Sequence, residues 1–157
     1  MKQIAVGFKK LNPRAILPAY QTEQAAGMDL HACVPEGETI LIPSGAWKLV
    51  QCGFAIEMPP GIEAQIRSRS GLALRGIIIL NSPGTIDADY RGEISAMLFN
   101  AGQSEFLVRH GDRIAQMVFN EIVVARPVLM DDLTPTTRGA GGFGHTGIGR
   151  RRQDVQP

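Results

Sequence analysis

The chain has 157 residues, of which 44% are hydrophobic and 20% are charged, and its formal net charge is +1 at pH 7. These values fit one globular domain with a substantial core that needs no metal or disulfide support. The near-neutral charge argues against binding to nucleic acid or an anionic membrane through an overall field, so any polyanion must be bound locally.

The N-terminal residues and the two cysteines bear on the cellular compartment. The opening sequence MKQIAVGFKK lacks the apolar run of a signal peptide, and no stretch approaches the roughly 18 apolar residues of a membrane span. Cys33 and Cys52 have neither the CxxC spacing of a redox or zinc site nor the density of a secreted disulfide scaffold. We therefore expect a cytoplasmic protein with reduced, structural thiols.

Short apolar segments dominate the chain, and glycine and proline separate them at short intervals, which is typical of strands joined by turns. Only residues 70–75 look helical, with Ser70 as the expected N-cap. An all-β fold, closed or sandwiched, is predicted because many strands leave few other ways to protect sheet edges. The predicted strands are residues 4–8, 27–33, 39–42, 47–58, 62–67, 77–80, 94–100, 104–109, 113–119 and 122–130.

The composition changes after residue 133. Residues 134–157 are rich in Gly, Thr and Arg and too poor in apolar residues to join a core. We therefore predict a β domain at residues 1–133, followed by a mobile, glycine-rich arm at residues 134–157.

The most polar stretch, residues 81–93, lies between two predicted strands and is interpreted as a β-hairpin. It brings an amide (Asn81), two carboxylates (Asp87 and Asp89) and a phenol ring (Tyr90) into a short segment. A turn alone does not require so many polar side chains, and hairpins held by a rigid sheet often contain functional residues. From this stretch alone, a solvated turn remains the alternative.

Two glycine-containing stretches resemble places where phosphate binds. Residues 67–71, Arg-Ser-Arg-Ser-Gly, follow a strand and open the predicted helix, although a solvated basic turn is the alternative. Residues 138–147 place small residues beside Arg138 and Thr146, so that backbone N–H groups can approach phosphate oxygens. Phe143, alone among glycines, is suited to cover a flat ligand, and a flexible tail is the alternative here.

Two strands contain polar residues in apolar surroundings. Gln116 interrupts the apolar run 113–119, and Asp29 does the same at 26–30. A buried polar group must find a partner in the protein or in a ligand. Together, these stretches offer a candidate base, two phosphate cradles, an amide and two aromatic rings. This combination predicts a site for a nucleotide polyphosphate.

The ordered motifs resemble those of one family, the homotrimeric dUTP diphosphatases (dUTPases). The resemblance spans about residues 25–147, and five motifs in order are far more specific than any one of them. It implies a jelly-roll-like subunit and a homotrimer whose active sites are shared between chains. The five segments are residues 26–30, 69–73, 81–93, 111–119 and 138–147.

In this family the reaction is hydrolysis of dUTP to dUMP and pyrophosphate, which keeps uracil out of DNA and supplies dUMP for thymidylate synthesis. By resemblance, Asp87 is the general base that activates water for attack on the α-phosphorus. Asn81 would read the uracil edge, Tyr90 would pack under the deoxyribose where a ribose 2′-OH does not fit, and Phe143 would stack over uracil.

The resemblance assigns the remaining substrate contacts mainly to phosphate. Mg²⁺ is expected to be held by the triphosphate and waters, with no direct protein ligand. Asp29 resembles a supporting acid, His145 stands where the family often has Ser, and residues 150–152 have no assigned role. The other expected substrate-binding residues are Arg69, Ser70, Gly71, Thr85, Met97, Gln116, Arg138, Gly144 and Thr146.

Two alternatives are weighed against this assignment. A dCTP deaminase of the same fold would need a glutamate at cytosine C4, whereas residues 81–93 offer Asp87, and Glu93 lies on the far strand. A nucleotide-gated binding module without hydrolysis would not need the candidate base Asp87 together with the Phe143 arm.

Overall fold

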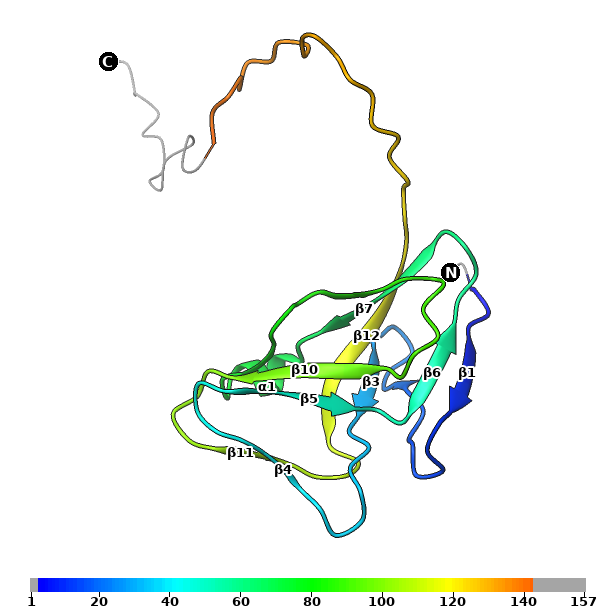
Figure 1. The fold of residues 1–157 in the computed structure, drawn as a ribbon, viewed down its shortest axis with the longest axis vertical. Coiled ribbons are helices and arrows are strands. Elements are labelled where there is room, and N and C mark those ends of the chain that lie inside the picture. The colour runs from blue at the N-terminus through cyan, green and yellow to red at the C-terminus, as the bar shows by residue number, and fades with distance from the viewer. Residues whose placement is uncertain (1–2, 143–157) are drawn as a thin grey trace, which may run out of the picture. The chain divides into compact units, whose positions relative to one another are not determined.

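The computed structural model describes residues 3–142. Regular structure in this part is almost entirely β, as predicted, with a single short helix, α1 (Ser70–Ala73) (Figure 1). The strands are β1 (Gly7–Lys10), β2 (Ala19–Tyr20), β3 (Met28–His31), β4 (Ile40–Ile42), β5 (Trp47–Gln51), β6 (Phe54–Glu57), β7 (Ile62–Arg67), β8 (Ile77–Ile79), β9 (Gly84–Ile86), β10 (Ser95–Asn100), β11 (Phe106–Val108) and β12 (Arg113–Glu121).

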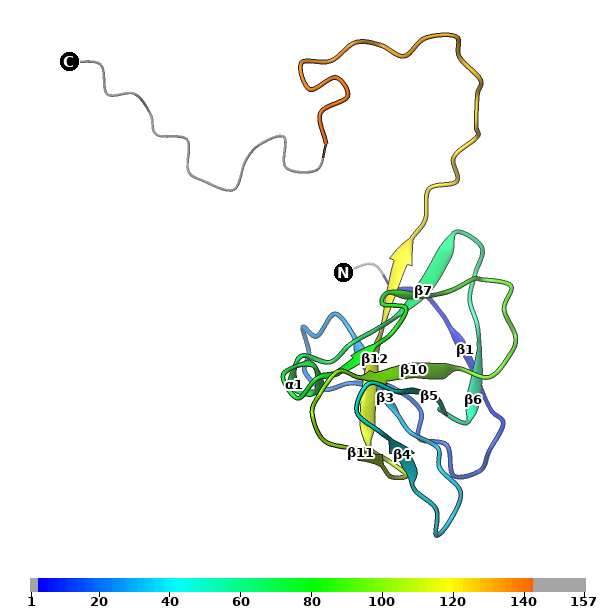
Figure 2. The same ribbon diagram turned by 60° about the vertical axis from the view of Figure 1, so that its left-hand side comes forward.

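The strands form two larger sheets and two small ones. The larger sheets have the orders β2-β3-β12-β7-β9 and β5-β10-β8, and the small ones pair β1 with β6 and β11 with β4. In Figures 1 and 2, β10 runs across β12, and Leu98 on β10 and Met117 on β12 are both fully buried. Burial of each such large apolar side chain contributes about 1.5–3 kcal/mol, so this core holds the sheets together.

Several predicted element boundaries are wrong in instructive ways. The predicted strand 47–58 is two strands, β5 and β6, because Gly53 between them takes a φ of 78°, which a continuous strand does not allow. The helix cap is Arg69 rather than Ser70, and no side chain caps the helix. The first strand begins later in the chain than the predicted strand 4–8, because β1 begins at Gly7. The short strand β2 was not predicted.

The predicted hairpin around residues 81–93 is only partly correct. β8 and β10 do pair antiparallel, with Ile79 opposite Leu98. Between them, however, β9 leaves this sheet and pairs with β7, with Thr85 opposite Gln65. The polar stretch therefore runs from one larger sheet to the other and back, which fixes it at both ends of β9 and opens space between the sheets.

The chain divides into two compact units, Met1–Val123 and Val124–Pro157. The first unit thus ends ten residues before the predicted boundary at 133. The predicted strand 122–130 is wrong: β12 ends at Glu121, and residues 122–130 are exposed without strand structure. Val123, for example, is 96% exposed, so its apolar character did not place it in the core. No helix within residues 3–142 is long and apolar enough to cross a membrane.

Candidate active site

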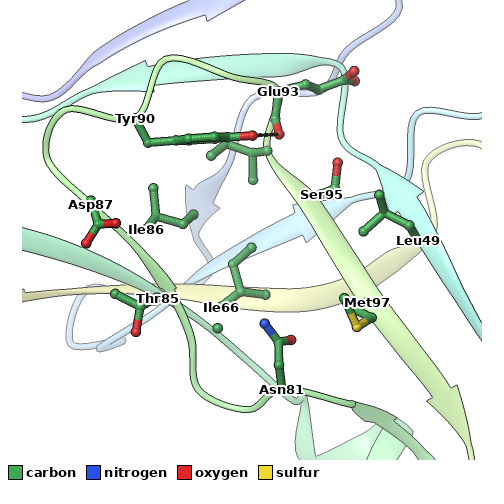
Figure 3. A pocket seen from close by; sticks show the side chains of 12 residues that line it. Leu49, Ile66, Asn81, Thr85, Ile86, Asp87, Tyr90, Glu93, Ser95 and Met97 are labelled. Atoms are coloured by element: carbon green, nitrogen blue, oxygen red, sulfur yellow. Dashed lines mark hydrogen bonds between the residues drawn. The ribbon is translucent and has the colours of Figure 1, made fainter.

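A pocket of about 260 Å³ lies where β9 leads through residues 87–94 into β10 (Figure 3). Five residues that were expected to bind substrate, including the candidate base Asp87, line it together. Asp89 does not line the pocket, which separates the two carboxylates of the stretch. The lining residues are Leu49, Ile66, Asn81, Gly84, Thr85, Ile86, Asp87, Tyr90, Glu93, Ile94, Ser95 and Met97.

The backbone that carries Asn81 is held on both sides. Leu80 N–H donates to the Met97 carbonyl at 2.8 Å, and Ser82 N–H donates to the Ile79 carbonyl at 3.3 Å. The amide of Asn81 lies close over Gly84, where a Cβ atom would come within 3.1 Å of its Nδ2. A side chain at position 84 would therefore push the amide away from its present place.

Several of the polar side chains in the pocket are free for a ligand. Within residues 3–142, the side chains of Asn81, Thr85 and Asp87 have no hydrogen-bond partner, and Figure 3 shows them around the pocket. Unpaired polar groups beside apolar surface are typical of small-molecule sites, where they fix the orientation of the ligand.

A compact turn joins Asp87 to Tyr90. Tyr90 N–H donates to the Asp87 carbonyl at 3.1 Å, and the Tyr90 hydroxyl donates to the Glu93 carbonyl at 3.2 Å. Arg91 Nη1 donates to the Ala88 carbonyl at 2.7 Å. The turn is thus closed by one backbone hydrogen bond and by the Tyr90 and Arg91 side chains, and the carboxylate of Asp87 is not needed to hold it.

Sequence reasoning missed the apolar floor of the pocket. Ile66 on β7, Ile86 on β9 and Ile94 before β10 are all buried and line the pocket, while Leu49 on β5 is more exposed. The alternation along β7 does predict that Ile66 faces inward. It does not say which cavity Ile66 faces, because that depends on the departure of β9 to the other sheet.

A second set of polar side chains lies outside the pocket, and we call it the arginine cluster. It consists of Asp29 on β3, Arg69 before α1, and Arg113 and Gln116 on β12. Asp29 accepts from Arg69 Nε at 2.8 Å and from Arg113 Nη1 at 3.1 Å. Its side chain is only 12% exposed, so two cations stabilise a largely buried carboxylate. Arg113 was not predicted as a partner, although it lies opposite β3 in the register.

Gln116 holds the loop before α1. Its Nε2 donates to the Ser68 carbonyl at 2.9 Å, and the Ser68 hydroxyl in turn accepts from Ile79 N–H at 2.9 Å. Gly27 leaves room for this amide, since a Cβ atom there would lie 2.7 Å from Gln116 Oε1. The loop is therefore fixed from β12 and β8, with Ser70 and Gly71 exposed at the start of the helix.

His31 borders the arginine cluster. Burial lowers the pKa of its imidazole from the ordinary value of 6.5; the Asp29 carboxylate opposes this, and the Arg113 and Arg69 guanidinium groups lower the pKa further. Its Nδ1 is buried and has no hydrogen-bond partner within the described residues. At neutral pH His31 is therefore uncharged, and the positive charge of the cluster resides on the two arginines.

Cys33 and Cys52 are buried free thiols. Burial raises the pKa of both, that of Cys52 to about 12, and the Glu93 carboxylate raises both further. Both thiols therefore stay protonated at neutral pH, which suits a structural role for the two cysteines.

The structure does not bring all the predicted residues together in one chain. None of Arg69, Ser70, Gly71 and Gln116 lines the pocket. Arg138 lies in the second unit, where its Nε donates to the Gly141 carbonyl at 2.8 Å. Phe143, Gly144, His145, Thr146 and residues 150–152 lie outside the described residues. In residues 3–142, no three His, Cys, Asp or Glu side chains are placed to hold a metal ion.

Comparison with known proteins places these features in context. The family model described as dUTPase matches residues 13–147. A deoxyuridine 5'-triphosphate nucleotidohydrolase of Maricaulis maris is 56% identical over 83% of this chain and 87% of its own length. A protein of the same name from Syntrophotalea carbinolica is 49% identical over 94% of this chain and 100% of its own length.

Solved structures show the same fold. The dUTPase of Staphylococcus bacteriophage 80alpha, solved with dUpNHpp, superposes with a TM-score of 0.82 at 21% identity, covering 92% of this chain and 99% of that chain. The dUTPase of phage phi11 of S. aureus, described with a structural Mg(II) ion, superposes with a TM-score of 0.74 at 18% identity, covering 83% and 99%. These likenesses confirm the predicted jelly-roll-like fold.

Proposed function

Because this chain belongs to the dUTPase family, we propose that it hydrolyses dUTP to dUMP and pyrophosphate. One observation carries the proposal: the free polar ends of Asn81, Thr85 and Asp87 surround an apolar floor in one pocket. The names of the two bacterial relatives, and dUpNHpp in the related phage structure, support the same substrate.

Asp87 is the proposed general base. Its carboxylate has no partner within the described residues, so it is available to accept a proton from water. The water oxygen then bonds to the α-phosphorus, and the bond from this phosphorus to the oxygen bridging to the β-phosphate breaks. Pyrophosphate leaves with that bridging oxygen, and the product that keeps the sugar and base is dUMP.

The pocket side chains select the base and the sugar. The Asn81 amide offers a donor and an acceptor, which match the alternating carbonyl and N–H groups on a uracil edge. Tyr90, with its aromatic ring at one end of the pocket (Figure 3), is proposed to pack under the deoxyribose and to exclude a ribose 2′-OH. Thr85 and Met97 complete the proposed contacts.

Arg69, Ser70 and Gly71 are the proposed phosphate loop. The ion pair with Asp29 supports this role because it fixes the Arg69 side chain before any ligand arrives. Gln116 donates one of its two amide N–H groups to Ser68, which leaves the other for a phosphate oxygen. The arm is proposed to add Phe143 over uracil, with Arg138, Gly144 and Thr146 on the β- and γ-phosphates.

A homotrimer with shared sites is proposed because the phosphate loop does not line the pocket of its own chain. Mixing two inactive variants tests this: Asp87→Asn chains keep an intact loop, and Arg69→Ala chains keep an intact pocket. After unfolding and refolding together, a mixed trimer regains part of the wild-type turnover. No regain of turnover, or a mass in solution other than three times the 17.0 kDa chain, contradicts sharing.

Mg²⁺ is the proposed cofactor, held by phosphate oxygens and waters. The pocket fits this arrangement, since the Asp87 carboxylate has no partner among the described residues and remains free to meet the attacking water. When bound, the ion neutralises charge on the triphosphate. Residues Arg69 and Ser70 would then position the same phosphates from the protein side.

An isotope experiment tests the chemistry. When the reaction runs in water labelled with the heavy oxygen isotope, attack at the α-phosphorus places the label in dUMP and leaves pyrophosphate unlabelled. Label in pyrophosphate would show attack at the β-phosphorus, and release of phosphate would show a different bond broken.

A deaminase is disfavoured because the Glu93 carboxylate already accepts from Gly53 N–H at 2.8 Å.

A further inference from the structure

We propose that Gly92 is a specificity-determining positioning residue that sets the place of the Tyr90 ring. The inference rests on the proposed function, because it concerns how the same pocket tells deoxyribose from ribose. A Cβ atom at position 92 would lie closer than 3.0 Å to the hydroxyl oxygen and two ring carbons of Tyr90. The ring thus lies directly on the backbone of Gly92, where only a glycine leaves room.

The hydroxyl end of the ring is fixed at the same place. The Tyr90 hydroxyl donates to the Glu93 carbonyl at 3.2 Å, and Figure 3 shows this bond at one end of the pocket. The Glu93 carboxylate accepts from Gly53 N–H at 2.8 Å, which ties residue 93 to the turn between β5 and β6. Glu93 therefore holds the backbone against which the ring rests.

The Tyr90 ring is partly exposed to solvent. Tyr90 is 46% exposed, and no aromatic partner contacts it within residues 3–142. A side chain at position 92 would therefore turn the ring outward and leave the core unchanged. The ring forms one face of the proposed sugar site, so turning it outward opens space beside the sugar. Only a substrate with an extra hydroxyl on the sugar binds better because of this space.

The test is the ratio of kcat/KM for dUTP to kcat/KM for UTP. Gly92→Ala is expected to lower this ratio by about tenfold, mainly by raising kcat/KM for UTP. Gly7→Ala on β1 is the matched control, because a Cβ atom there meets its nearest neighbour at an ordinary 3.5 Å. This control keeps the wild-type ratio.

A double-mutant cycle with Tyr90→Leu separates positioning from a general structural effect. If Gly92 acts through the ring, Gly92→Ala changes the ratio less than twofold in the Tyr90→Leu background. An unchanged ratio in the single variant, or an equal fall in both backgrounds, overturns the proposal. Turnover of dUTP by the unmodified chain decides the proposed function separately.

Glu93 gives a second test in case Gly92→Ala does not fold. Glu93→Ala removes the acceptor of Gly53 N–H and is expected to lower the same ratio, while Glu93→Gln keeps an acceptor oxygen and restores most of it. Equal ratios in Glu93→Ala and the unmodified chain would mean that this backbone does not set the ring, which contradicts the proposal.

Discussion

The pocket and the arginine cluster differ in how their polar side chains are used. In the pocket, Asn81 and Asp87 have no partner within the described residues. In the cluster, Asp29 binds both Arg69 and Arg113, so its carboxylate is already paired. The pocket therefore keeps its polar groups for a ligand, while the cluster is a prearranged support. Substitutions in the pocket should change turnover, and those in the cluster should also change stability.

Loss of the proposed base should lower turnover more than any other change and should leave binding intact. Asp87→Asn removes only a proton acceptor and should lower kcat by about 10³-fold, with the affinity for dUpNHpp near that of the unmodified chain. Stopped-flow kinetics and calorimetric titration measure the two quantities. Asp89→Asn is the control, since Asp89 does not line the pocket. Equal turnover of Asp87→Asn and the unmodified chain would show that Asp87 is not the base.

Removal of the arm should also affect turnover without affecting the fold. A chain that ends at Asp132 keeps the whole first unit, Met1–Val123, and should melt at nearly the same temperature. Its turnover should fall by about 100-fold, because the phosphate contacts proposed for the arm are lost. Circular dichroism and pyrophosphate release measure both. Unfolding of the shortened chain would make the arm a structural element.

The arginine cluster is tested by comparing two ion pairs. Asp29→Ala leaves two arginines without their carboxylate; because Arg113 is partly solvated, the loss of unfolding free energy should be about 1–3 kcal/mol. Glu57→Ala breaks the exposed pair with Arg91, whose side chains are 72% and 51% exposed, and should cost less than about 0.5 kcal/mol. Urea unfolding compares them. Equal losses would contradict a supporting role for Asp29.

His31 should give the stability of the fold a weak dependence on pH. Its pKa is lowered in the folded chain, so the unfolded chain binds the proton more readily. The stability from this site is complete above the ordinary pKa of 6.5 and is lost as pH falls through the lower folded value. Melting temperatures of the unmodified chain and His31→Asn should therefore converge below pH 6.5. A constant difference across pH 5 to 8 would exclude this titration.

The sequence predicted several residues that the structure brings together in one pocket, because they lie in one short segment. Asn81, Asp87 and Tyr90 stand within one polar stretch, and their meeting in one pocket follows from a turn held by two sheets. The alternation at residues 62–67 likewise predicted β7 with its correct bounds. Local patterns of this kind depend on side-chain period and turn residues, which a single sequence carries.

The remaining features depend on contacts between distant segments. The pairing of β9 with β7 depends on how the two sheets pack, and the turn pattern around residues 81–84 does not predict it. The pairing of Asp29 with Arg113 spans strands 84 residues apart. Residues 122–130 have an apolar pattern typical of a strand, yet no neighbouring strand of the described chain pairs with them. A periodic pattern gives no partner, so it does not fix a strand.

Substrate selection can be measured in a single experiment. The chain is mixed with dUTP, dCTP, dTTP and UTP in the presence of Mg²⁺, and release of pyrophosphate and ammonia is measured. We expect pyrophosphate from dUTP alone and no ammonia from any substrate, because Asn81 is proposed to select uracil and Tyr90 is proposed to exclude the ribose hydroxyl. Pyrophosphate from several nucleotides, ammonia from dCTP, or no product at all would contradict this expectation.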